Sequence, residues 1–348
     1  MSIEVKDYGV TADGQQVKQY IMTNRQGMKA VLLNYGAVVT EIHVPDKEGV
    51  LQDVVWGYDS VAGYEGNGTG FGSPIGRNAN RIGGARIEIA GKQYELQKNN
   101  GENNLHGGQP GYNCRMWRGL IADDNKVEFS LESPDGDQGF PGNAKVKISY
   151  TLTEENELRI AYEASADQDT IFNLTNHSYF NLEGQTSDNV LEQQVWMDAD
   201  AFTPTDDGLI PTGEIRSVQG TPMDFRSYHA IGERIEEDYE PLKQAGGYDH
   251  NYVLNNEGGY ALCCKLKSLK TGIVMEVYTD LPGMQLYSSN FLDKEAGGKS
   301  GRVYGRRSAV CFESQYFPDA VHHENFKSPI CPAGETYRTV TGYRFTLE

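Results

Sequence analysis

The sequence predicts an all-β protein, a large antiparallel β-sandwich with few short helices. Three features of the chain indicate this class. Apolar residues recur at every second position in several segments, polar turns separate those segments, and helical periodicity is rare. Alternation with a period of two directs successive side chains to opposite faces of a strand. The 40 glycines and 21 tyrosines are also typical of many strands joined by tight turns.

The clearest strands form hairpins. Residues 86–96 alternate on both sides of a central glycine, which predicts two strands and a tight turn. Residues 127–131 alternate in the same way. Residues 146–152 and 158–162 alternate too, and the polar segment 154–156 between them predicts a strand, a turn and a strand.

Helical signals are confined to two short segments. Residues 59–64 have room for a single turn. Ile231, Arg234 and Ile235 fit one short helix that we expect after Ser227. With so few helical segments, a large antiparallel sandwich is favoured over a doubly wound sheet.

Length and composition indicate an ordinary soluble globular protein. The 348 residues are 38% hydrophobic and 23% charged. We find no Pro-rich or Ser-rich linker, so we expect a single domain over residues 1–348. The longest apolar runs, such as 273–275, are far too short to span a bilayer, and we expect no membrane partner. The N-terminus lacks a basic segment followed by an apolar one, which favours a cytoplasmic protein.

The net charge and the cysteines indicate which partners and which compartment suit this protein. A formal net charge of −18 argues against nucleic acid, because phosphate backbones repel such a surface. An odd number of cysteines without paired spacing does not resemble a disulfide framework, and we expect reduced thiols. We expect a monomer or a homodimer. The five cysteines are Cys114, Cys263, Cys264, Cys311 and Cys331.

Several segments partly match cofactor-binding or metal-binding motifs, but their residue spacing differs from what those motifs require. The alternating glycines of 66–72 lack the third glycine position of a dinucleotide fingerprint. The Gly-Lys-Ser tripeptide 298–300 lacks the first glycine of a phosphate loop. Residues 135–139 lack oxygen ligands that a calcium loop needs, and the consecutive His322 and His323 would diverge on a strand. We therefore expect no cofactor and no metal.

Four stretches are dense in polar side chains of catalytic type. They comprise 76–84 together with 104–108, then 173–182, 248–251 and 312–320. Each is weak alone, because a histidine next to glycine is usually a turn residue and a histidine among polar residues can be a satisfied buried group. Glu313 follows an apolar strand, where an unpaired buried carboxylate is costly, so it must be solvated, paired or functional.

Taken together and in this order, the four stretches resemble the galactose mutarotases, also called aldose 1-epimerases. The resemblance covers nearly the whole chain. It begins with 34–37, 44–46 and 53–57 and ends with 313–315 and 332–337. It implies the fold of that family, a large mutarotase-like β-sandwich with a cleft for a sugar.

The resemblance also implies roles for individual residues. His177 would be the general acid and Glu313 the general base. The sugar would be held by His106, Arg81, Asp249 and Gln285, while Asn80 and Tyr179 would line the site. The 321–323 stretch, Val-His-His, departs from the family, in which an asparagine is frequent there. That departure concerns specificity at the rim rather than the chemistry.

The implied reaction explains these residue types. An anomer converts when its hemiacetal opens, the aldehyde rotates about C1–C2, and the ring closes on its other face. A base must take the C1 hydroxyl proton while an acid protonates the ring oxygen. An ionised glutamate and a protonated histidine suit neutral pH. We therefore expect an isomerase of carbohydrate metabolism that interconverts the α and β anomers of free aldohexoses such as galactose and glucose.

Three alternatives stay open. A hexose-phosphate epimerase would need a basic pocket for a dianion, which Arg77 and Arg81 could supply. A glycosidase would need two carboxylates, such as Glu313 and Asp249, and would leave His177 idle. A non-catalytic sugar-binding module would keep the hydrogen-bonding residues without needing the acid–base pair. Optical rotation of a freshly dissolved sugar distinguishes catalysis from binding.

Overall fold

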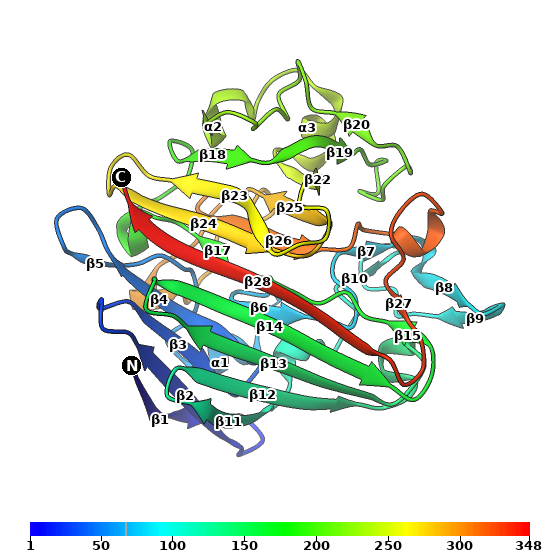
Figure 1. Ribbon diagram of the computed structural model, residues 1–348, viewed down its shortest axis with the longest axis horizontal. Coiled ribbons are helices and arrows are strands. Elements are labelled where there is room, and N and C mark those ends of the chain that lie inside the picture. The colour runs from blue at the N-terminus through cyan, green and yellow to red at the C-terminus, as the bar shows by residue number, and fades with distance from the viewer. Residues whose placement is uncertain (67) are drawn as a thin grey trace.

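The computed structural model describes residues 1–66 and 68–348 and consists mainly of antiparallel strands (Figure 1). The largest sheet has nine strands in the order β11-β12-β13-β14-β28-β24-β23-β18-β21. Neighbouring strands in it run antiparallel. The strands are β11 (Arg118–Asp123), β12 (Lys126–Ser133), β13 (Ala144–Leu152), β14 (Glu157–Ala166), β28 (Thr336–Leu347), β24 (Ile273–Thr279), β23 (Ala261–Lys267), β18 (Gln194–Met197) and β21 (His229–Ala230). The prediction of an all-β fold is confirmed.

A six-stranded sheet, in the order β17-β26-β25-β22-β19-β20, packs against the nine-stranded one. Met284, Leu286 and Phe312 of this sheet share one apolar core with Met275 and Tyr343 of the larger sheet. Alternation along β25 and β26 turns the intervening residues to the opposite face. That opposite face carries the candidate site. The strands are β17 (Tyr179–Phe180), β26 (Val310–Gln315), β25 (Gly283–Tyr287), β22 (Asp249–Leu254), β19 (Ala199–Thr203) and β20 (Arg216–Ser217).

The remaining strands form one five-stranded sheet and four pairs. The five-stranded sheet lies beside β11 and β12 at the lower left of Figure 1. It contains β1 (Ser2–Val10), β2 (Gln16–Thr23), β3 (Lys29–Leu33), β4 (Val39–Pro45) and β5 (Leu51–Asp53). The pairs are β6 (Ser73–Ile75) with β16 (Thr175–His177), β7 (Arg81–Ile82) with β10 (Asn104–Leu105), β8 (Arg86–Ile89) with β9 (Lys92–Glu95), and β15 (Thr170–Ile171) with β27 (Ile330–Cys331).

The predicted hairpins are confirmed. Strands β13 and β14 pair with Tyr150 opposite Ile160, and β8 pairs with β9 around Gly91, whose φ of 76° suits a tight turn. Both short helical segments also form, as α1 (Val61–Glu65), which the Ser60 side chain caps, and α2 (Ile231–Arg234). A third helix, α3 (Glu240–Ala245), is not predicted by the sequence. It spans six residues and ends at Gly246, whose φ is 64°, so it is too short to show a helical period.

All five cysteines are free thiols, and four of them are buried. None of the helices among the described residues combines the length and the apolar character that crossing a membrane requires.

Candidate active site

A cavity of about 270 Å³ opens over the polar face of the six-stranded sheet. Seven of the eight residues singled out in the sequence line it; the eighth, Gln285, donates a hydrogen bond to Asp249 at its base. The lining residues are Gly68, Thr69, Asn80, Arg81, Leu105, His106, His177, Tyr179, Asp249, Tyr287, Phe291, Leu292 and Glu313. Segments far apart in the sequence therefore meet at one place.

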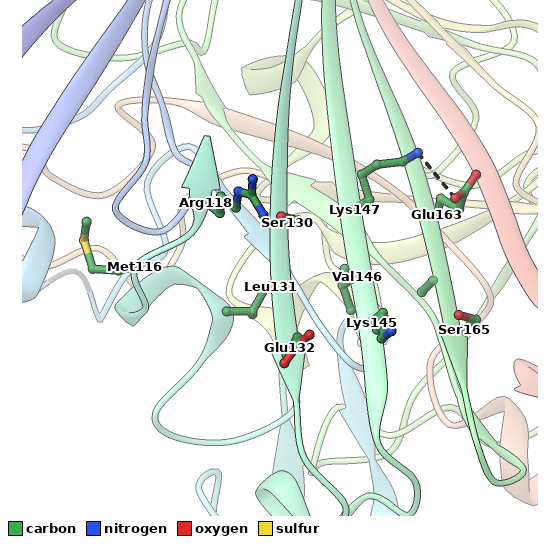
Figure 2. A pocket seen from close by; sticks show the side chains of 11 residues that line it. Met116, Arg118, Ser130, Leu131, Glu132, Lys145, Val146, Lys147, Glu163 and Ser165 are labelled. Carbon is green, nitrogen blue, oxygen red and sulfur yellow. Dashed lines mark ion pairs between the residues drawn. The ribbon is translucent and has the colours of Figure 1, made fainter. Parts of the chain in front are cut away.

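A larger hollow, of about 520 Å³, lies on the outer face of β11–β14 (Figure 2). Its polar side chains, such as Lys145, Lys147 and Glu163, belong to an ordinary charged strand face, and Lys147 Nζ lies 3.4 Å from Glu163 Oε1. None of the eight singled-out residues lines it. We therefore place the chemistry in the smaller cavity.

Strand register brings His177 and Glu313 together. Tyr179 of β17 pairs with Cys311 of β26. His177 precedes Tyr179 by two residues and Glu313 follows Cys311 by two, so both lie beyond this pair on the same side of it. Side chains that neighbour each other in this way on antiparallel segments come within contact distance. His177 Nε2 lies 3.5 Å from Glu313 Oε1.

Aromatic rings fix the plane of the His177 imidazole. Tyr179 stacks on it with ring centroids 4.9 Å apart and an interplanar angle of 20°. The rings of His106 and Tyr287 meet it edge-on, at 5.3 Å and 6.2 Å. The histidine is thus held in one orientation from three sides.

The floor of the cavity is a chain of side-chain hydrogen bonds across three strands. Asn251, Gln285 and Glu313 are cross-strand neighbours on β22, β25 and β26. Gln285 Nε2 donates to Asp249 Oδ1 at 2.6 Å, and Gln315 Nε2 donates to Gln285 Oε1 at 3.1 Å. Since Gln315 orients Gln285, the Asp249 carboxylate is fixed before any sugar binds.

Arg81 forms an ion pair with the Asp249 carboxylate on one side of the cavity. Its Nη1 lies 3.9 Å from Asp249 Oδ2, and its Nε donates to Asn100 Oδ1 at 3.1 Å. Both members of the ion pair are 8% exposed, so they face the cavity rather than bulk solvent.

Two hydrogen bonds join Asn80 and His106, one between backbone atoms and one from the Asn80 backbone to the His106 ring. Both residues adopt left-handed backbone conformations, with φ values of 60° and 54°. The His106 amide donates to Asn80 O, and the Asn80 amide donates to His106 Nδ1 at 3.1 Å. An accepting Nδ1 means that the neutral ring carries its proton on Nε2. His106 is therefore a hydrogen-bond donor toward the cavity.

Burial governs the charges of the central pair. It raises the pKa of Glu313 well above its usual value, and the charge of Asp249 adds to this rise. It lowers the pKa of His177 to about 4, although a backbone hydrogen bond and Asp249 oppose this. Burial thus disfavours the charged form of each group, the carboxylate of Glu313 and the imidazolium of His177. Residue types alone do not reveal this effect, and the ionised glutamate and protonated histidine expected from the sequence stay a prediction.

Comparison with known proteins agrees with this geometry. The family model described as aldose 1-epimerase matches residues 18–344. This chain belongs to the aldose 1-epimerase family. It is 42% identical to the galactose mutarotase of Bos taurus, over 92% of each chain, and 35% identical to the aldose 1-epimerase of Escherichia coli (strain K12), over 97% of each. The crystal structure of a GalM/aldose epimerase homologue from C. elegans superimposes with a TM-score of 0.87 at 34% identity, covering 94% of this chain and 98% of that one. The chain is accordingly an enzyme of the isomerase class that epimerises sugars.

One arginine of this aldose 1-epimerase lies away from the cavity. Arg77 is fully buried, and its five N–H groups share seven hydrogen-bond contacts, to Ser133, Thr170 and three further backbone carbonyls. It cannot help to bind a phosphate as the hexose-phosphate alternative supposes. Among the described residues that line the cavity, Arg81 is the single arginine, and Asp249 already faces it.

His106, His177 and Glu313 each offer a ligand atom within 4.8 Å of the other two. The sequence does not show this grouping, since three separate segments supply it. The protonated Nε2 of His106 is a donor, whereas a metal ligand needs a free lone pair. The group is therefore better suited to sugar hydroxyls than to a cation.

Some residues in the cavity wall and behind it are not predicted by the sequence argument. Phe291 is 59% exposed and stacks on Tyr287 with ring centroids 6.1 Å apart, so it offers an apolar face at the mouth. Cys311 lies behind His177. Its position two residues before Glu313 on the same strand could have revealed it, because residues i and i+2 share a face. His322 and His323, in the stretch that departs from the family, contact Asp319 and do not line the cavity.

Proposed function

We propose that this aldose 1-epimerase interconverts the α and β anomers of free aldohexoses such as galactose and glucose, with His177 and Glu313 as the proton-transfer pair. The observation that carries the proposal is the 3.5 Å separation of His177 Nε2 and Glu313 Oε1. The two groups lie in a cavity whose other polar side chains suit the hydroxyls of a sugar. An acid and a base within reach of one ring carbon are what ring opening requires.

In the reactive state, the pair starts with its exchangeable proton on His177 Nε2 and with Glu313 ionised. Ionised Glu313 takes the proton of the C1 hydroxyl while His177 Nε2 gives its proton to the ring oxygen. The bond between C1 and the ring oxygen breaks, and C1 becomes an aldehyde. After rotation about C1–C2, Glu313 returns its proton to the C1 oxygen and His177 regains one from the ring oxygen as the bond re-forms. The pair ends with the proton count that it began with.

The reactive charge state requires the transfer of a proton within the pair. Moving one proton from Glu313 to His177 Nε2 leaves the net charge of the buried site unchanged. The Arg81 guanidinium lowers the pKa of Glu313, against the larger effect of burial. A sugar hydroxyl that donates to the carboxylate favours its ionised form in the same direction. Substrate binding therefore promotes the charge state that the reaction uses.

The remaining residues are assigned to binding. Asp249, held by Gln285 and Arg81, accepts from sugar hydroxyls, and His106 donates through Nε2. Asn80 positions His106, and Tyr179 positions His177. Orientation of this kind lowers the barrier by placing the reacting atoms in line before reaction.

We also infer a cytoplasmic enzyme of carbohydrate metabolism that acts as a monomer or homodimer without a nucleic-acid, membrane or metal partner. Five free thiols support a reducing compartment. The net charge of −18 disfavours nucleic acid.

Polarimetry tests the proposed function. Freshly dissolved α-D-galactose or α-D-glucose should reach its equilibrium rotation faster in the presence of catalytic amounts of protein. Free sugars should also show a higher kcat/KM than their 6-phosphates, because Arg81 already faces Asp249. Tight sugar binding without faster relaxation would establish a binding module instead. A preference for a 6-phosphate would establish a hexose-phosphate epimerase.

A further inference from the structure

The side of the His177 ring that faces away from Glu313 contacts a buried thiol. Cys311 Sγ lies 3.5 Å from His177 Nδ1, and the cysteine is fully buried. Cys311 and Glu313 lie two residues apart on β26 and share its cavity face. The imidazole is therefore held between two side chains of one strand, with Nδ1 toward Cys311 and Nε2 toward Glu313.

Strand pairing explains why Cys311 and His177 are in contact. Tyr179 is the cross-strand partner of Cys311, which leaves His177 diagonal to Cys311. Diagonal neighbours on an antiparallel pair are within reach of a ring as large as imidazole. Tyr179 stacks on His177 and fixes the plane of the ring, and within that plane Nδ1 lies on the side of the thiol.

We propose that Cys311 is a positioning residue that accepts a hydrogen bond from His177 Nδ1–H and so leaves Nε2 as the nitrogen that exchanges the catalytic proton. This inference rests on the proposed function of the pair. A neutral imidazole carries one proton, and whichever nitrogen holds it fixes the role of the other. With Nδ1 protonated, Nε2 can accept a proton and give it back without forming an imidazolate.

The chemistry of a thiol suits this task. Burial raises the pKa of the Cys311 thiol well above its usual range, so sulfur stays uncharged at neutral pH. An uncharged, weakly accepting sulfur fixes the tautomer without holding the ring in its charged form, as a carboxylate at Nδ1 would. A thiol is also a weak donor, so leaving its S–H unpaired costs little.

The tautomer with Nδ1 protonated is compatible with both positions of the shared proton, on Glu313 and on His177 Nε2. When Glu313 is protonated, its O–H faces a bare Nε2. When the proton has moved, Nε2–H faces a carboxylate. Nδ1–H remains on sulfur throughout, and only the proton between His177 and Glu313 changes place. Loss of Cys311 should therefore act on turnover rather than on sugar binding.

Two variants and a matched control test the inference. Cys311→Ala should lower kcat roughly tenfold or more, less than the loss of His177 itself, and leave KM little changed. Cys311→Ser keeps a small neutral acceptor and should recover most of that turnover. Cys264→Ala removes an equally buried thiol from β23, outside the cavity, and should keep wild-type turnover at a comparable loss of thermal stability.

Nitrogen-15 spectra of histidine-labelled protein report the tautomer directly. The His177 signals, identified by their loss in His177→Asn, should show a protonated Nδ1 and a bare Nε2 in the wild type and a changed mixture in Cys311→Ala. A wild-type ring protonated on Nε2, or a Cys311→Ala protein with unchanged kcat, would overturn the inference. Because the spectra need no turnover, they test Cys311 even if the wild type proves inactive toward anomers.

Discussion

Replacing Glu313 with glutamine tests catalysis and stability separately. Glutamine preserves the shape of the side chain but cannot take the proton of the C1 hydroxyl. General acid–base catalysis is worth about 10²–10⁴ in rate, or about 3–5 kcal/mol of barrier, and kcat should fall by that factor. Sugar affinity should persist, because Asp249, Arg81 and His106 are unchanged.

The same substitution should not weaken the fold at neutral pH. The pKa of Glu313 is raised in the folded state above its usual 4.5. The stability gained from the protonated group is therefore full below the unfolded pKa and is lost as the pH rises through the folded one. At pH 7, folding must either take up a proton or bury a charge, and each tenfold change in the acid dissociation constant corresponds to about 1.4 kcal/mol. Glutamine avoids this cost, so the variant should melt at the wild-type temperature or above it.

Polarimetry and thermal melting on the same samples decide the matter. Initial relaxation rates of α-D-galactose over a range of concentrations give kcat and KM, and calorimetry gives the binding constant for the sugar. A folded Glu313→Gln protein with wild-type turnover would refute the assignment of the base. A variant that loses stability and activity in proportion would show that Glu313 is structural.

Three further outcomes follow from the site. Asp249→Asn should weaken sugar binding and lower kcat as well, because orientation contributes to the barrier; unchanged KM and kcat would remove Asp249 from the site. Exhaustive dialysis against a chelator should leave turnover intact, since side chains supply both acid and base; activity that falls and returns with a divalent ion would contradict this. Arg77→Met should cost several kcal/mol of unfolding free energy, about 1–3 for each buried acceptor left unpaired, and urea unfolding at wild-type stability would contradict the role given to its buried hydrogen bonds.

Local strand patterns could be predicted from the sequence, whereas the sheet order could not. Alternation over 146–152 and 158–162 predicts the hairpin of β13 and β14, because both strands have one face in the core. Nothing local shows that β14 pairs next with β28, the C-terminal strand. The pairing of β14 with β28 depends on core packing between residues far apart in the sequence, so a short segment of the sequence cannot predict it.

The candidate site divides in the same way. The family resemblance singles out His177 and Glu313, and their roles stay a prediction until variants are assayed. The protonation states depend on burial from both sides, which residue types do not reveal. Arg77 lies within a catalytic-looking stretch, yet its side chain points into a cage of carbonyl groups. Short motifs identify which residues are unusual, and only packing decides which way each one faces.

Strand β26 shows how the fold supports the chemistry. On its core face, Phe312 O accepts from Tyr343 Oη at 3.0 Å and Ser314 bonds to Thr341, both from β28. On its cavity face it presents Cys311 and Glu313. A strand anchored from behind holds its other face at fixed spacing, which places the sulfur and the carboxylate at the two nitrogens of His177. The pair can be deeply buried because it is neutral overall in either position of the shared proton. A low-dielectric environment penalises a lone charge, but it does not penalise a neutral pair to the same extent, and it increases the free-energy difference between the two protonation states.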